Sequence, residues 1–89
     1  MIFCITYEFK NSEKNYSDFF LEMKKLGEAN QFMNNCWFLS SETTNNDIYE
    51  SLKKHLDGPD LLFITSINLN TTSGWLPSTS VEWLRDLNR

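Results

Sequence analysis

The carboxylate of Glu8 is the one side chain in this sequence whose type and position suggest chemistry. It comes at the end of the stretch from Ile2 to Phe9, which is almost continuously apolar and rich in β-branched and aromatic residues. Such a stretch predicts a central strand, covered on both faces, that would hold Glu8 at its end. The structural alternative is an ordinary strand-end carboxylate that is solvated or paired with Lys10.

Other polar residues offer weaker candidates. Asp57 and Asp60 flank a predicted turn, where their charges are expected to solvate a helix end and a strand start. Ser40 and Ser41 have no histidine placed to activate them, so a hydrolase triad is not supported. His55 is the only histidine of the chain, and a lone histidine at a helix C-terminus usually has a structural role.

Composition narrows the classes of protein to consider. The chain has 89 residues, the size of one domain, with 8 basic and 12 acidic residues and a net charge of −4. This acidic balance disfavours a protein whose main task is to bind a phosphate backbone. No basic leader or membrane-length apolar run is visible, so we expect a cytoplasmic protein without a membrane partner. Cys4 and Cys36 fit no metal spacing and are expected as buried thiols on strands.

The stretch from Tyr16 to Leu26 has apolar residues at helical spacing. We expect Asn15 to be its N-cap and Gly27 to follow it in the left-handed conformation. After this helix, short strands are predicted at 30–33 and 36–40. They would be joined by a two-residue turn, although one long bent strand is an alternative.

A second helix is predicted from Asp47 to Leu56. Either a capping box of Asp47 and Glu50 or the side chain of Thr44 would cap its N-terminus. The Gly58-Pro59 pair ends this helix. The next stretch, Leu61 to Ile67, resembles the opening strand because it too is apolar for most of its length.

The C-terminal extension begins with a polar loop and a hydrophobic Trp75-Leu76-Pro77 segment. A short final helix follows, with Thr79 as its expected N-cap and Glu82 in the reciprocal position. We expect this extension to dock on the domain or on a partner subunit, because its tryptophans and leucines would otherwise leave an unusual apolar patch in water.

The order of elements predicts an α+β, ferredoxin-like βαββαβ fold. It has an antiparallel four-stranded sheet, two helices on one face and a short C-terminal helix. Residues 1–69 form the core of this single domain, and residues 70–89 form its C-terminal extension.

Both faces of the predicted sheet are apolar, yet the two helices can cover only one of them. The opening strand alternates Ile2 and Cys4 with Phe3 and Ile5, whereas a sheet with one solvated face should alternate apolar with polar residues. We therefore expect a second copy of the chain or the C-terminal extension to cover the open face. The first possibility predicts a symmetric homodimer.

Several short segments resemble the CRISPR-associated Cas-two-type proteins and their relatives, the SinR-family and VapD-like proteins. Ile5-Thr6-Tyr7-Glu8-Phe9 is similar to their first strand, which ends in an aromatic residue, an acid and an apolar residue. The segment 36–41, followed by Ile48 and Leu52, resembles their third strand and second helix. The segments 57–64 and 74–76 resemble their last core strand and the stretch after it.

This resemblance implies a ferredoxin-like homodimer that acts either as a non-catalytic scaffold or as a metal-dependent nuclease. In a nuclease, Glu8 from both subunits would hold a magnesium ion near the dimer axis and would be the catalytic and metal-binding residue. The CRISPR-associated branch generally has aspartate there, and a displaced carboxylate can cost orders of magnitude in rate.

Three functions follow from these observations. The first is a small homodimeric scaffold or interaction module without catalysis or cofactor. The second is the magnesium-dependent nuclease of RNA or DNA that uses Glu8, although the acidic charge disfavours nucleic acid as a partner. The third is a small-ligand regulatory domain, which rests on analogy with other ferredoxin-like folds.

Overall fold

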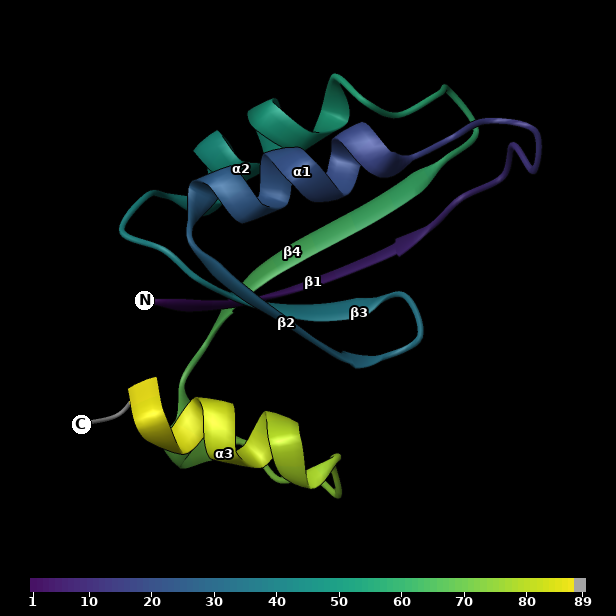
Figure 1. The fold of residues 1–89 in the computed structure, drawn as a ribbon. Helices are drawn as coiled ribbons and strands as arrows, with labels where there is room; N and C mark the ends of the chain where they lie inside the picture. The colour runs from purple at the N-terminus through teal and green to yellow at the C-terminus, as the bar shows by residue number, and fades with distance from the viewer. Residues whose placement is uncertain (88–89) are drawn as a thin grey trace.

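The computed structural model describes residues 1–87 of the chain and confirms the predicted fold (Figure 1). The elements are β1 (Ile2–Glu8), α1 (Ser17–Leu26), β2 (Glu28–Met33), β3 (Cys36–Ser40), α2 (Asn45–Lys53), β4 (Leu61–Ile67), a 3-10 turn η1 (Leu69–Thr71) and α3 (Ser78–Leu87). The strands form one sheet in the order β2-β3-β1-β4, with every neighbouring pair antiparallel. This is the ferredoxin-like order that two right-handed crossovers produce. β1 therefore lies in the interior of the sheet, as expected, and β4 and β2 are its edges.

The main core lies between the sheet and helices α1 and α2, which cover the same face (Figure 1). β1 contributes its alternate residues to this core, and each helix contributes one apolar stripe, as period-2 and period-3.6 patterns require. The buried residues of this cluster are Phe3, Ile5, Tyr7, Tyr16, Phe19, Met23, Leu39, Ile48 and Leu52.

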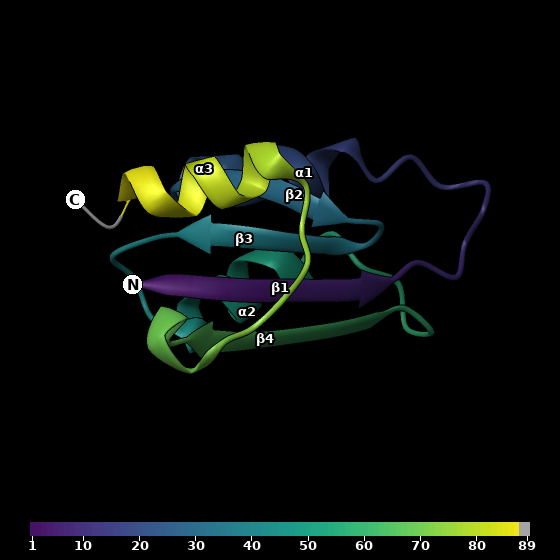
Figure 2. The ribbon, with the colours of Figure 1, turned by 90° about the horizontal axis from the view of Figure 1, so that it is seen from below.

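The C-terminal extension covers part of the opposite face of the sheet. α3 lies against β2, and the segment before it crosses β1 and β3 (Figure 2). The Trp83 ring stacks on Phe38 with ring centroids 6.4 Å apart, and Phe38 stacks in turn on Phe32 at 3.9 Å. Docking of the extension on its own domain, one of the two expected arrangements, therefore accounts for the β2–β3 half of the open face. Phe63 of β4 remains 65% exposed on the same face.

Two side-chain polar atoms are buried without a hydrogen-bond partner among residues 1–87. They are the Ser80 hydroxyl, in the first turn of α3, and the Asn30 side-chain oxygen, on β2. A buried polar group without a partner is destabilising. These two groups therefore reduce the stability that the surrounding parts of α3 and β2 gain from burying apolar surface.

Gly27 follows α1 as predicted, but the expected left-handed conformation is wrong. Its φ of 165° and ψ of −162° are extended backbone that any residue adopts. The reason for glycine is space, because a Cβ at this position would overlap the carbonyl oxygen of Ser40 on β3. The strand after α1 can start at Glu28 only because the two backbones approach closely here.

The predicted N-cap of α1 is wrong by one position. Tyr16 is the capping residue and its side chain makes no capping bond, while Asn15 accepts a hydrogen bond from the backbone N–H of Ser17 at 2.9 Å. For α2, the capping box of Asp47 and Glu50 is wrong and the Thr44 alternative is confirmed. The Thr44 hydroxyl accepts from the backbone N–H of Asp47 at 3.1 Å, and α2 begins at Asn45.

The final helix also begins earlier than predicted. α3 starts at Ser78, and the carbonyl of Pro77 accepts hydrogen bonds from Ser80 and Val81. Thr79 consequently lies inside the helix, and its assignment as N-cap is wrong. The two-residue turn between β2 and β3 is confirmed, because Asn35 has a φ of 61°, which asparagine tolerates better than most residues.

Candidate functional site

Glu8 lies at the end of β1, on the face of the sheet away from α1 and α2. Its side chain is 57% exposed, and the Lys10 ammonium donates to its Oε1 at 2.9 Å. Within one chain, Glu8 is therefore paired with Lys10, which is the structural alternative given above. An exposed ion pair of this kind contributes little to stability.

Glu8 also borders an exposed apolar strip of β4. Glu8 pairs with Leu61 across the two strands, and Thr6 pairs with Phe63. We refer to Leu61 and Phe63 as the β4 patch; they are 56% and 65% exposed. A shallow hollow of 290 Å³ lies here, lined by both of these residues and by Glu8. The site thus combines one carboxylate with two large apolar side chains that the rest of the chain leaves uncovered.

One chain does not supply a magnesium site around Glu8. A hard divalent cation takes about six oxygen ligands, whereas this carboxylate is paired with a cation, Lys10. Within residues 1–87 no three His, Cys, Asp or Glu side chains are grouped so that they could hold a metal ion. Glu8 therefore offers a metal ion one carboxylate, which is already paired with Lys10.

Asp57 and Asp60 join the turn before β4 to the loop after β1. The Tyr16 hydroxyl donates to Asp60 at 2.9 Å, and the backbone N–H of Lys10 donates to the same carboxylate at 2.7 Å. Asp57 is bound by the Lys14 ammonium at 3.0 Å. The prediction that these residues only solvate a helix end and a strand start is therefore incomplete. Each carboxylate also binds a segment more than 40 residues away in the sequence.

Hydrogen bonding lowers the pKa of both carboxyl groups. For Asp57, donation from Asn11 is the largest cause and donation from Lys14 the next. For Asp60, desolvation alone would raise the pKa, but hydrogen bonds from the Lys10 and Asp57 backbone and from Tyr16 outweigh it. Both groups therefore favour the folded state in their ionised form.

Replacing Asp60 by asparagine should flatten the acid limb of the stability profile. Because its folded-state pKa lies below the ordinary value of 3.8, the carboxylate stabilises the fold above that pH, and this contribution is lost as the pH falls further. Urea unfolding between pH 7 and pH 2.5 would measure the effect. Glu13→Gln, an exposed loop substitution, is the control, and an unchanged slope in Asp60→Asn would contradict the assignment.

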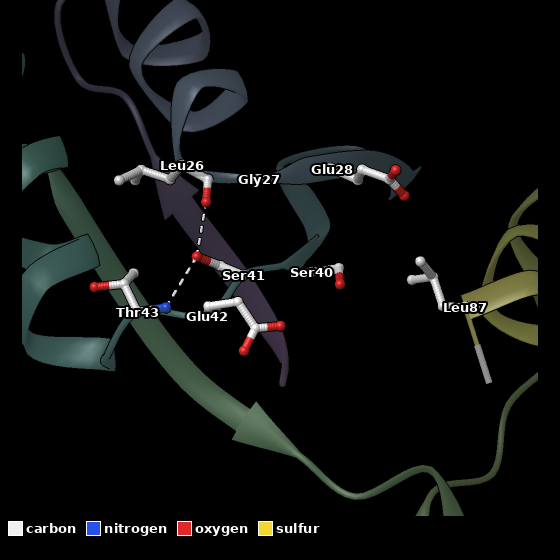
Figure 3. Close-up of a pocket in the computed structure, with 8 residues that line it drawn as sticks. All are labelled: Leu26, Gly27, Glu28, Ser40, Ser41, Glu42, Thr43 and Leu87. Atoms are coloured by element: carbon white, nitrogen blue, oxygen red, sulfur yellow. Dashed lines mark hydrogen bonds between the residues drawn. The ribbon is translucent and has the colours of Figure 1, made fainter. Parts of the chain in front are cut away.

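Ser40 and Ser41 line a cleft of 660 Å³ between the end of α1 and the end of α3 (Figure 3). The Ser41 hydroxyl is buried and donates to the carbonyl of Leu26 at 2.7 Å. It also accepts from the backbone N–H of Thr43 at 3.3 Å. These bonds brace the chain between β3 and α2. In agreement with the sequence analysis, no histidine lines the cleft to activate either serine.

The remaining candidates also have structural surroundings. His55 lies 3.9 Å from the carboxylate of Glu22 on α1, so it links α1 to the turn after α2 when protonated. Cys4 and Cys36 are free thiols on β1 and β3, as predicted, but each is only partly buried. The Cys36 thiol is 3.5 Å from the hydroxyl of Thr6.

Sequence reasoning missed the partners of Asp57 and Asp60, which are Asn11, Lys14 and Tyr16. No local sequence pattern predicts these contacts, because they depend on how the loop after β1 packs against the turn before β4. It also missed the β4 patch as a distinct surface, because either a second copy of the chain or the extension was expected to cover the open face as a whole.

Comparison of the chain with protein-family models, with curated proteins and with solved structures found no match. A search of the described residues for a helix long and apolar enough to cross a lipid bilayer found none.

Proposed function

We propose that this protein is a small interaction module that self-associates through the β4 patch and has no catalytic activity of its own. The exposure of Leu61 and Phe63 is the observation that carries the proposal. Contiguous exposed patches of large apolar side chains are typical of surfaces that contact another molecule.

The surroundings of the patch support self-association. β4 is an edge strand of seven residues that contains no charged residue and no proline. Natural edge strands that must stay monomeric usually carry charges, prolines or bulges that block a partner. A two-fold axis beside β4 would place the same patch on both subunits, which is the self-complementary arrangement of symmetric dimers. The resemblance to SinR-family proteins adds a homodimeric precedent.

Phe63→Glu is expected to weaken the dimer by at least about 30-fold, the equivalent of the 2 kcal/mol or more lost at a central interface contact. The introduced charge would be buried without a partner in the dimer but solvated in the monomer. Sedimentation equilibrium across a range of protein concentrations measures the change.

The matched control is Ser66→Glu, because Ser66 is an exposed residue of the same strand but on its other face. This variant should associate as the wild-type chain does. A wild-type chain that stays monomeric at every concentration, or equal weakening in both variants, would contradict self-association through the patch.

A metal-dependent nuclease is the second proposal, and the position of Glu8 favours it. Because Glu8 is the cross-strand neighbour of Leu61, a symmetric dimer through the β4 patch would bring two Glu8 carboxylates towards one axis. Lys10 would have to release its ion pair for a magnesium ion to bind there. The acidic charge of the chain speaks against a nucleic-acid substrate.

An assay of purified protein with magnesium or manganese, on single-stranded RNA and duplex DNA, separates the two proposals. Cleavage that is lost in Glu8→Ala while the dimer persists would establish the nuclease and end the scaffold-only function. Cleavage that survives the substitution would remove the Glu8 mechanism. Absence of cleavage with an intact dimer supports the interaction module.

A further inference from the structure

A groove lies between the open face of the sheet and the C-terminal extension, on the side where α3 is docked. Cys4 and Phe38 belong to the sheet side of this groove, and Leu76 and Leu84 belong to the extension. The chain therefore bounds the groove from two directions. Its volume is 500 Å³, within the range of about 300–1,000 Å³ that is usual for small-molecule sites.

The residues that line the groove disfavour a charged ligand. These twelve residues include no Asp, Glu, Lys, Arg or His. The polar side-chain groups are the hydroxyls of Thr72 and Ser73, the indole N–H of Trp75 and the thiol of Cys4, and desolvation raises the pKa of that thiol. A charged ligand would lose its hydration here without gaining a partner. An uncharged, mainly apolar ligand loses little.

The exposed aromatic side chain of the groove favours an aromatic ligand. Phe32 and Phe38 also line the groove, but they stack on each other with an interplanar angle of 15° and are almost buried, so little of either ring is open to a ligand. Trp75 also lines it, yet its side chain is fully exposed. A molecule in the groove would bury part of this indole, and aromatic rings packed against one another gain about 0.5–1.5 kcal/mol beyond their burial.

We propose that this groove binds a small uncharged aromatic molecule of one or two rings. The proposal goes beyond self-association, because the groove and the β4 patch share no lining residue. A second copy of the chain is a less suitable occupant, since the groove lies under a segment of the same chain rather than on an open face.

Titration of the full chain with N-phenyl-1-naphthylamine, an uncharged probe that brightens in apolar surroundings, tests the proposal. We expect saturable binding of one probe per chain. Cys4→Phe should weaken binding by at least about tenfold, because the larger side chain fills the groove. Cys36→Phe is the matched control, since Cys36 is the other partly buried free thiol and lines neither the groove nor the hollow beside the β4 patch, and it should leave the affinity within about twofold.

Chemical-shift mapping on the wild-type chain with naphthalene keeps the test decisive if Cys4→Phe fails to fold. Shifts concentrated at Phe38, Leu76 and Leu84 would support the site. The proposal would be overturned by any of three results: no saturable binding, equal affinity in the two variants, or shifts centred on the β4 patch. Shifts at the groove residues that follow protein concentration without probe would also overturn it, because a second copy would then be the occupant.

Discussion

Phe19→Ala is expected to lower the free energy of unfolding by about 3–5 kcal/mol, the usual cost of removing a buried phenylalanine. Phe19 is fully buried on α1. Its ring meets Tyr7 and Phe9 edge-on, at centroid distances of 5.2 Å in both cases. The substitution removes both aromatic contacts and leaves a cavity where α1 crosses the sheet. For a domain of this length, whose whole stability is about 4–13 kcal/mol, the loss is a large fraction.

Urea unfolding followed by circular dichroism measures this effect. Leu21→Ala is the control on the same helix, because Leu21 is 55% exposed, and its cost should stay within about 0.5 kcal/mol. Equal effects of the two substitutions would contradict the position of α1 over the sheet.

Gly27→Ala is expected to destabilise the fold by about 2–3 kcal/mol, towards the upper end of overpacking costs. The added Cβ would overlap the Ser40 carbonyl oxygen, which is backbone and cannot swing aside. To accommodate it, the start of β2 would have to move away from β3, which would weaken the pairing of Glu28 with Ser40.

Thermal unfolding compares this variant with Gly58→Ala, the matched substitution at a second glycine. No atom lies within 4 Å of a Cβ at Gly58, and neither glycine adopts a left-handed backbone conformation. Gly58→Ala should therefore be neutral or stabilise slightly by restricting the unfolded chain. If Gly27→Ala also proved neutral, the close approach of β2 and β3 at this point would be wrong.

The fold followed from the sequence because its strongest signals are periodic. The apolar run of β1, the stripes of α1 and α2 and the asparagine turn before β3 each required only neighbouring residues to interpret. Their order then left few topologies once right-handed crossovers were imposed. The capping residues were less predictable, since Asn15, Thr44 and Asp47 are all chemically suited to cap and local packing decides among them.

The candidate site was predictable only in part, for a related reason. Pairing of Glu8 with Lys10 joins residues two apart on the chain, so the sequence alone suggested it. The Tyr16–Asp60 bond joins residues 44 apart, and its geometry exists only after the sheet has formed. The β4 patch could not be predicted without knowing which part of the sheet α3 covers. That depends on the stacking of Trp83 on Phe38, which the spacing of residues within the helix does not determine.

Because of the way α3 is attached, we expect the helix and the sheet to unfold as separate cooperative units. Residues 68–77 tether this helix to β4 without joining the sheet, and its stacking contact with the domain is one tryptophan on one phenylalanine. β1, in contrast, is hydrogen-bonded on both sides. We therefore expect the helix to detach in local opening events while the sheet stays folded. Each such event would expose Phe32 and Phe38 to solvent. The apolar surface area that is open to other molecules would therefore vary with time.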